Sequence, residues 1–177
     1  MEIKKFYLIE DFNERTQQKI KKHSNIGVII HYNEYNILNT INKIKNINCS
    51  NKLYVANNHR YITNYKIDGV YLSSFNKKIK SYQNIFGFNY PIIGSAHNFK
   101  EIFQKIRAGC NIIFLSNIFK TQSHPKRKTN IGLIKFLLIR RQIKQVRIYA
   151  MGGITKKTFK ILNSINKNIG YGGISSF

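Results

Sequence analysis

The stretch from Ile148 to Ser175 reads IYAMGGITKKTFKILNSINKNIGYGGIS, and it decides the fold of the chain. Two short apolar runs each end in a glycine pair, Gly152-Gly153 and Gly172-Gly173. Between them, Thr155 to Lys167 has the spacing of a helix. Strand, glycine turn, helix and strand is the pattern of a βα unit in a parallel sheet. Glycines at such strand ends let an anion approach backbone N–H groups, so both pairs are predicted to bind phosphate.

The same alternation runs through the rest of the sequence. Apolar strands are expected at residues 5–9, 26–31, 53–56, 69–72, from 91, 111–116, 146–151 and 169–174. Helices are expected from Asp11 or Asn13 to 22, and at 34–47, 60–65, 77–85, 99–108, 131–143 and 155–167. Eight strands and seven helices predict a parallel α/β fold, and the strand number favours a closed (β/α)8 TIM barrel over an open sheet.

The predicted barrel is minimal. All 177 residues are expected to form a single domain, 1–177, although such barrels rarely have fewer than about 200 residues. The sequence stops at Phe177, just after the last strand, so the barrel is predicted to lack its last helix. The flank left uncovered would favour a partner subunit such as a second copy, a homodimer.

The composition narrows the class of protein. An apolar content of 42% is that of a globular protein, but the net charge of +23 favours an anionic partner: a substrate, a membrane surface or a nucleic acid. An AT-rich genome explains the abundance of Lys, Asn and Ile equally well, and nucleic acid is the less favoured partner. Two isolated cysteines, no signal peptide and no apolar run of membrane-spanning length predict a cytoplasmic protein without a zinc site.

Polar side chains follow the predicted strands, where barrels carry their function. They are Asn57, Asn58, His59, Ser73, Ser74, Asn76, Ser95, His97, Asn98, Asn117, Thr121, Ser123 and His124. Because carboxylates are nearly absent, the set predicts a mouth that binds anions and no metal site. His97 and His124 are candidate proton-transfer groups, against structural readings as a helix-start residue and a solvated loop residue.

Five segments appear in the order seen in the thiamine-phosphate synthase/TenI-like superfamily, which the chain resembles, in particular its Ser-His-Pro subgroup. They are Gly94-Ser95-Ala96-His97, Ala108-Gly109, the stretch from Ser116 to Pro125, Gly132-Leu133, and Ala150-Met151-Gly152-Gly153-Ile154. Earlier segments are also similar, with Tyr7 to Asp11 matching the opening Y-L-I-T-D and Ile67 to Leu72 matching A-D-G-V-H-L.

The resemblance implies a protein of thiamine biosynthesis. Synthases of this family are transferases that join a pyrimidine diphosphate to a thiazole phosphate with Mg²⁺, and its tautomerases move a proton on a thiazole phosphate. The implied phosphate-binding residues are Gly152, Gly153, Gly172, Gly173 and Ser175. The implied substrate-binding residues are Asn57, Thr121 and Ser123, and the implied catalytic residues are Ser95, His97 and His124.

Several family positions carry other residues here. The Q-x-R-x-K strand end becomes 29–33, IIHYN, the N-D turn becomes Asn57-Asn58 or Asn58-His59, and G-Q-E-D becomes 73–76, SSFN. His124 stands where the family has the diphosphate lysine. Mg²⁺ is therefore expected only if synthase activity is retained. A thiazole tautomerase and a non-catalytic phosphate- or RNA-binding barrel stay open as alternatives.

Overall fold

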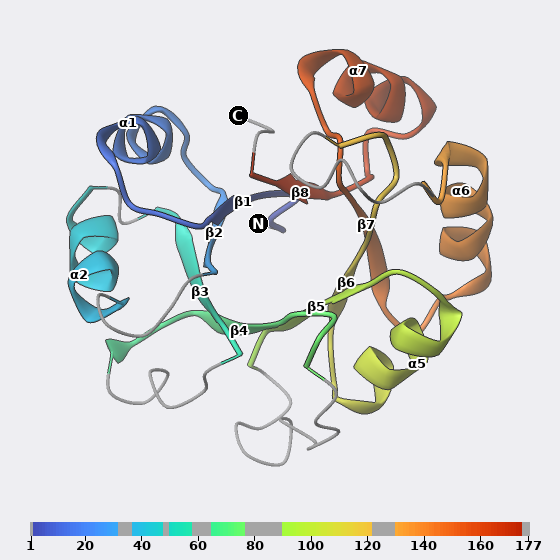
Figure 1. Cartoon of the computed structure of the whole chain (residues 1–177), viewed down its shortest axis with the longest axis horizontal. Helices are drawn as coiled ribbons and strands as arrows, with labels where there is room; N and C mark the ends of the chain where they lie inside the picture. Colours follow the sequence, from blue (N-terminus) through green and yellow to red (C-terminus); the bar gives the residue numbers. More distant parts are fainter. Residues whose placement is uncertain are drawn as a thin grey trace.

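Eight parallel strands close into a barrel in the order β1-β2-β3-β4-β5-β6-β7-β8, with β8 returning to pair with β1 (Figure 1). The computed structural model describes residues 2–31, 37–47, 50–57, 65–76, 90–121 and 130–174. The strands are β1 Lys5–Ile9, β2 Gly27–Ile30, β3 Lys52–Ala56, β4 Gly69–Leu72, β5 Ile92–Ala96, β6 Ile112–Leu115, β7 Arg147–Met151 and β8 Tyr171–Gly173. The predicted TIM barrel is confirmed, with every expected strand in its place.

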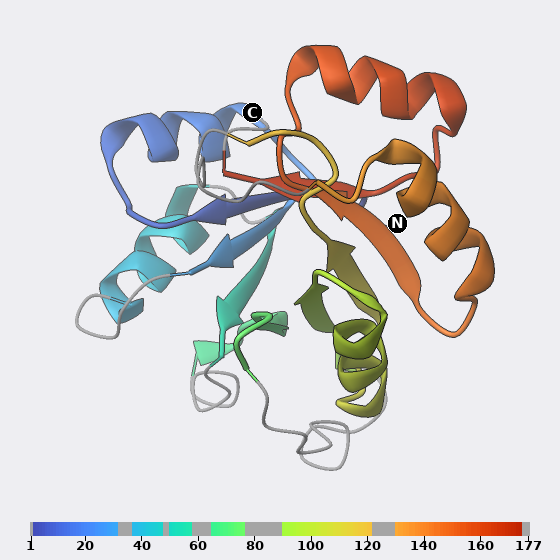
Figure 2. The ribbon, with the colours of Figure 1, turned by 45° about the vertical axis from the view of Figure 1, so that its right-hand side comes forward.

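Helices lie on the outside of this barrel. Within the described residues they are α1 Glu14–Lys22, α2 Ile37–Ile47, α5 Phe99–Arg107, α6 Leu133–Gln142 and α7 Lys156–Ile165. The helices α1 and α2 lie on one side, and α5, α6 and α7 lie on the other (Figures 1 and 2). The helices expected at 60–65 and 77–85 fall outside the described residues, apart from residue 65. None of the described helices is long and apolar enough to cross a bilayer.

Local sequence explains where several helices begin and end. Asn13 caps α1, since its side-chain oxygen accepts a hydrogen bond from the Thr16 N–H at 2.9 Å. Asn98 does the same for α5 through the N–H of Glu101. That helix stops before Gly109, which adopts the φ of 87° that favours glycine. Of the two caps expected for the first helix, the structure uses Asn13.

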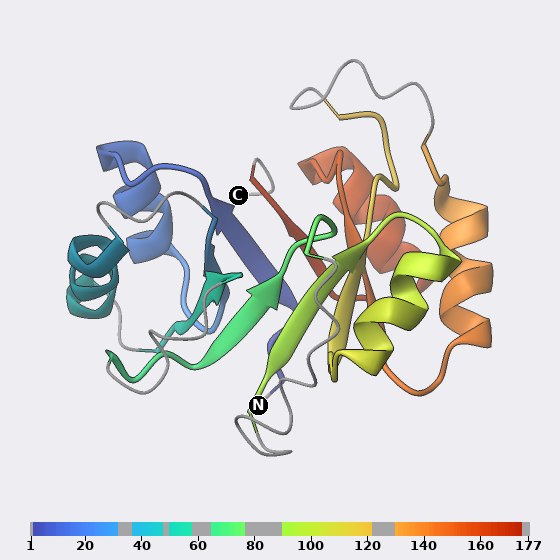
Figure 3. The same cartoon turned by 60° about the horizontal axis from the view of Figure 1, so that its bottom comes forward.

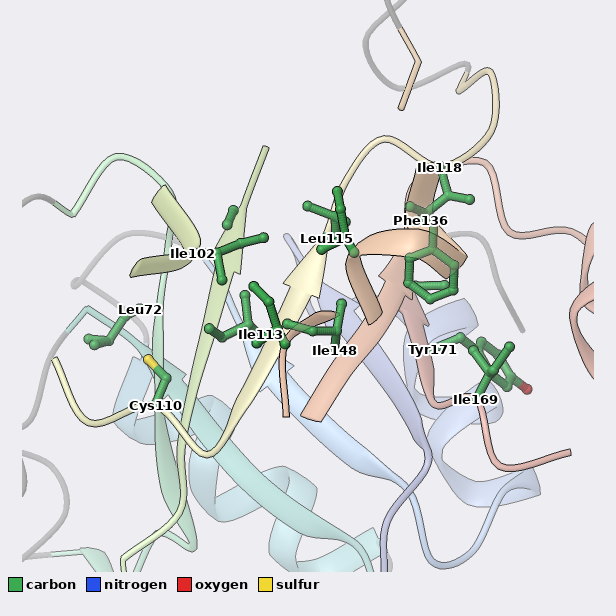
Figure 4. Packing of buried hydrophobic residues seen from close by; sticks show 14 of the residues in the cluster. Leu72, Ile102, Cys110, Ile113, Leu115, Ile118, Phe136, Ile148, Ile169 and Tyr171 are labelled. Carbon is green, nitrogen blue, oxygen red and sulfur yellow. The ribbon is translucent and has the colours of Figure 1, made fainter. Parts of the chain in front are cut away.

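Apolar side chains form a layer on each side of the strands. One cluster lies between β4–β8 and the helices α5 to α7, and Figure 4 shows Ile113 beside Ile148, its partner on the neighbouring strand. A second cluster lies beneath α1 and α2, with Ile20 and Ile41 fully buried. These clusters fix each helix against the strands that it follows.

Aromatic rings fill the interior of the barrel. Phe6 lies at the centre, with ring centroids 5.7 Å from Tyr54, 5.2 Å from Phe114 and 6.1 Å from Tyr149. Interiors of this kind are mostly packed with branched aliphatic side chains, which are smaller than these rings. Glycines on neighbouring strands make the room, as a methyl group on Gly27 would lie 2.2 Å from the Phe6 ring.

The strands run in one direction, so their carboxyl ends meet at one rim (Figure 3). At the opposite end, Glu2 accepts a hydrogen bond from the Tyr149 hydroxyl at 2.8 Å and pairs with Arg147 at 3.2 Å. The N-terminal segment therefore contacts β7 at the base of the barrel.

We predict that Gly27→Ala destabilises the protein by about 1–3 kcal/mol, because the added methyl group overpacks the ring of Phe6. Urea unfolding of both proteins measures the difference. Phe6→Leu in the Gly27→Ala background should recover part of the loss, since the smaller side chain vacates the contested volume. Equal and additive effects of the two substitutions would contradict the predicted contact.

Candidate functional site

A cavity of about 650 Å³ opens at the rim formed by the carboxyl ends of the strands. This volume lies within the range of small-molecule sites, which is about 300–1,000 Å³. Its lining comes from the ends of seven strands and the segments after them: Leu8, Glu10, His31, Tyr71, Ser73, Ser74, Phe75, Ser95, His97, Ser116, Asn117, Lys120, Thr121, Met151, Gly152, Gly153, Ile154, Thr155, Gly173 and Ile174. Residues from distant parts of the sequence thus share one concave surface.

The cavity brings together several of the site residues predicted from the sequence. Ser95, His97, Thr121 and the first glycine pair all line it, as does Gly173. Asn57 and Gly172 are not among the lining residues. Ser123, His124 and Ser175 lie outside the described residues, so their roles stay predictions.

The turn at Gly152 and Gly153 packs tightly against the segment after β6. Both glycines have positive φ, 86° and 68°, and a methyl group on Gly153 would lie 2.4 Å from the carbonyl oxygen of Lys120. The N–H groups of Ile118 and Phe119 donate to the carbonyls of Met151 and Gly152 at 3.0 and 3.1 Å. Glycine is required here for backbone shape and for close approach of the two loops.

Helix α7 begins directly after this turn. Its cap, Thr155, lines the cavity and forms a capping box with Thr158. The first turn of α7 holds Lys156 and Lys157 and no acidic residue. A helix N-terminus carries a partial positive charge, so the ammonium groups of lysines placed there are repelled by it. An anion bound at the start of α7 would relieve this repulsion.

The two residues of the second glycine pair have different roles. Gly173 lines the cavity, whereas Gly172 faces the barrel interior, where a methyl group would lie 2.9 Å from the Phe114 ring and 3.3 Å from Cβ of Phe6. Gly172 therefore makes room for aromatic packing. The sequence pattern alone does not separate these two positions.

His97 is held by Ser116, at the end of the neighbouring strand β6. Its Nδ1 lies 2.8 Å from the Ser116 carbonyl oxygen and 2.9 Å from the Ser116 hydroxyl. A carbonyl oxygen only accepts hydrogen bonds, so Nδ1 carries the proton in the neutral ring. Nε2 is then the basic nitrogen of the neutral ring, which makes His97 a candidate for proton transfer.

Ser95 and Tyr71 form the floor of the cavity. Both are buried, and their hydroxyl groups are hydrogen-bonded. Burial raises the pKa of the Tyr71 phenol to about 12, so Tyr71 stays protonated at neutral pH. His31 lies over this tyrosine, with ring centroids 5.8 Å apart. The floor therefore offers neutral hydroxyl groups to a ligand.

The Asn57 side chain forms hydrogen bonds with the segment that follows β4. Its Oδ1 accepts hydrogen bonds from the Ser73 N–H at 3.0 Å and from the Asn76 side chain at 3.2 Å, and its Nδ2 donates to the Ser73 hydroxyl at 3.0 Å. These bonds fasten the segment after β4 to the end of β3. The side chain is thus used to shape the rim.

The sequence model of the thiamine monophosphate synthase family matches residues 17–169. The chain belongs to this family. The resemblance recognised from the glycine, Ser-Ala-His and Thr-x-Ser-His-Pro segments is confirmed by this match.

Individual relatives agree with the assignment. The chain is 31% identical to the thiamine-phosphate synthase of Flavobacterium johnsoniae over 109 residues, which is 59% of the chain and 51% of the relative. It is 35% identical to the putative thiamine-phosphate synthase 2 of Aquifex aeolicus over 89 residues, 50% of the chain and 46% of the relative. The chain therefore spans about half the length of these curated relatives.

Solved structures share the fold. The thiamine phosphate pyrophosphorylase of Pyrococcus furiosus superposes with a TM-score of 0.73 at 18% identity, covering 98% of this chain and 86% of the other. A glycerol uptake operon antiterminator-related protein from Thermotoga maritima gives a TM-score of 0.64 at 13% identity, covering 99% and 96%. At such identities the likeness speaks for the barrel alone.

The described residues do not fit the Mg²⁺ that the family resemblance implies. In the described part of the cavity lining, Glu10 is the one carboxylate, and the described residues hold no group of three or more His, Cys, Asp or Glu side chains placed for a metal. Asn57, an implied substrate contact, has an Oδ1 that already accepts hydrogen bonds from Ser73 and Asn76. Mg²⁺ requires several oxygen ligands, and the described lining does not supply them.

Sequence reasoning missed Lys105. This α5 residue is 3% exposed, and its Nζ donates to the carbonyl oxygens of Ser73 at 2.6 Å and Asn76 at 2.9 Å. Burial lowers its pKa, and the Coulomb attraction of Cys110 and Glu101 opposes this shift. The helical spacing of α5 gives a hint, since Lys105 lies three residues after the buried Ile102 and thus on the inward face.

We predict that the stability of the wild type relative to Lys105→Met rises as pH increases toward 10.5. The folded protein releases the Lys105 proton at a lower pH than the unfolded chain, so raising the pH favours the folded state, and the gain is complete above 10.5. Urea unfolding of both proteins at several alkaline pH values measures this difference, in which other titrating groups cancel. A difference that stays flat or falls with pH would contradict it.

Proposed function

We propose that this chain binds a thiazole phosphate in the mouth of its barrel, as a protein of thiamine biosynthesis. The observation that carries the proposal is the Gly152-Gly153 turn, which lines the cavity where α7 begins. The phosphate would lie between this turn and Gly173, as in barrels that bind phosphate after their last two strands. Family membership supplies the ligand class. Ser175 stays a predicted further contact.

The reaction assigned to this site is a proton transfer at the bound ring. His97 would act as the acid or base through Nε2, while the Ser116 carbonyl holds Nδ1 and fixes the tautomer. Ser95 and Tyr71 would position the ring through their hydroxyl groups. His124 stays a second candidate acid, and Thr121 and Ser123 stay candidate substrate contacts. A tautomerase or a coupling enzyme could each use this proton transfer.

Coupling to a pyrimidine diphosphate is the second candidate function. The names of the relatives favour it, and a cavity of about 650 Å³ is large enough for two small substrates. The described residues provide no fitting set of metal ligands, which argues against efficient charge neutralisation of a diphosphate leaving group. Formation of thiamine phosphate from both substrates, with and without Mg²⁺, separates this candidate from tautomerisation.

Calorimetric titration tests the binding proposal. The wild type should bind thiazole phosphate more tightly than the dephosphorylated thiazole, because the glycine turn and the α7 N-terminus interact with the phosphate. A chelator should leave the affinity unchanged, as no metal is assigned to this subsite. If only RNA binds, with steep salt dependence, the proposal is wrong and the excess of lysine has a different purpose.

We predict that Gly153→Ala lowers the affinity for thiazole phosphate by about tenfold or more. The added methyl group would displace the turn from the Lys120 carbonyl, moving the N–H groups that face the phosphate, and each lost charge-assisted hydrogen bond is worth about 1.5–3 kcal/mol. Gly132→Ala is the matched control. Gly132 has a similar φ of 79°, but a methyl group there meets nothing within 4 Å, and the residue does not line the cavity. Equal losses of affinity in both variants would show that backbone strain alone is responsible.

We predict that His97→Asn keeps the affinity for thiazole phosphate within about threefold but lowers turnover by about 10²–10⁴-fold, because the amide cannot transfer a proton. Turnover is followed as thiazole isomerisation and as thiamine phosphate formation in parallel. Ser116→Ala retains the carbonyl contact with Nδ1 and should lose far less activity. Full activity of His97→Asn in both assays would remove His97 as the acid or base.

A further inference from the structure

Phe75 occupies an unusual position at the rim of the cavity. It lines the cavity and yet 77% of its surface is exposed. A phenyl ring in water forgoes the hydrophobic stabilisation that burial gives. The surrounding residues of the same turn, Ser73 and Asn76, are buried or half-buried. Phe75 is therefore the large apolar side chain that this turn presents to solvent.

The turn that carries Phe75 is held by contacts from α5 and from the end of β3, and by a hydrogen bond of its own. The Lys105 Nζ donates to the carbonyls of Ser73 at 2.6 Å and Asn76 at 2.9 Å, from α5 on one side. From the end of β3, Asn57 accepts the Ser73 N–H at 3.0 Å. Within the turn, the Asn76 N–H donates to the Ser73 carbonyl at 3.0 Å. The backbone on either side of Phe75 is thereby held in place.

The Lys105 ammonium group that holds this turn is buried. Lys105 is 3% exposed, and removing an ammonium group from water is unfavourable unless hydrogen bonds compensate. The Lys105 Nζ donates hydrogen bonds to two carbonyls of the turn. A fixed backbone keeps the Phe75 ring near the cavity without the entropy loss that ordering a mobile loop on binding would require.

Phe75 also lies across the mouth from the proposed phosphate subsite. The turn follows β4, whereas Gly173 lies at the end of β8, and these strands are diametrically opposed in the closed order of eight. A phosphorylated ligand held at Gly152, Gly153 and Gly173 must direct its other end away from them. The cavity floor between the two sides carries Tyr71 and Ser95.

We propose that Phe75 is a specificity-determining residue whose ring stacks on the flat heteroaromatic ring of a bound substrate. The inference rests on the proposed function and deepens it, since it names what is recognised opposite the phosphate. The ring could come from the thiazole phosphate or from a pyrimidine diphosphate, because both offer a planar π face. Stacking needs no hydrogen-bond partner from Phe75, which fits its exposed position at the rim.

Calorimetry with three probes tests this inference: thiazole phosphate, a pyrimidine diphosphate and inorganic pyrophosphate. Phe75→Leu keeps the apolar character of the side chain but removes its π face. It should lower the affinity for the ligand whose ring stacks on Phe75 by about 3–10-fold. Inorganic pyrophosphate should bind as it does to the wild type. The matched control is Phe103→Leu, which changes a ring on α5 that is 49% exposed and does not line the cavity. This control should leave all three affinities unchanged.

A second readout uses the absence of tryptophan from the 177-residue sequence. In Phe75→Trp the new indole would be the only one, and its fluorescence should change on addition of the stacked ligand and not on addition of pyrophosphate. The ring ligand that loses affinity in Phe75→Leu and alters this fluorescence identifies the source of the ring.

The two levels of proposal fail separately. If the wild type binds thiazole phosphate, but Phe75→Leu binds both ring ligands equally well, the stacking inference is wrong and the proposed function stands. If the wild type binds no ring phosphate more tightly than pyrophosphate, both are wrong. If Phe75→Leu lowers the affinity for pyrophosphate as much as the affinity for the ring ligands, Phe75 only maintains the shape of the rim. This result would also overturn the stacking inference.

Discussion

The packing of aromatic rings against glycines inside the barrel is the constraint on which the structure depends. A barrel of eight short strands has an interior that side chains must fill completely. Here aromatic rings occupy that space, and Gly27 and Gly172 make room on the two strands that flank β1. Strand β8 could not pair with β1 at this register if residue 172 carried a large side chain. Closure of the barrel and packing of its interior are thus one requirement.

Above this interior, the rim is built from loops that hold one another. The Gly152-Gly153 turn fits against the segment after β6, and the Ser116 carbonyl at the base of that segment holds His97 on β5's loop. On the other side, Asn57 and Lys105 hold the turn after β4. The loops are therefore coupled to neighbouring strands and not only to their own. A substitution in one loop will be felt at the side chains presented by the next.

Much of this fold follows from local sequence. Apolar runs, helical spacing and an Asn13 cap located β1, α7 and α1 closely, because strand and helix periodicity are properties of neighbouring residues. Positions lining the cavity were predictable where a strand end carries its own polar residue, as at Ser95 and His97. The roles of Gly172, Asn57 and Lys105 were not predictable. Each depends on partners 16 or more residues away in the sequence, which only the closed barrel brings near. A glycine pair has no feature of its own that separates a packing position from a cavity position.

The seam between β1 and β8 has one more consequence. It joins Lys5 to Tyr171 and Tyr7 to Gly173, so the barrel closes through the two strands most distant in sequence. Contacts of such long range form only after a large loss of chain entropy, which makes this seam the costliest to assemble. Gly173 belongs both to the seam and to the cavity lining. A molecule bound against it would act as a clasp, favouring the sealed barrel over states in which β8 has come away. During synthesis, binding could therefore begin only once the chain had been made through β8.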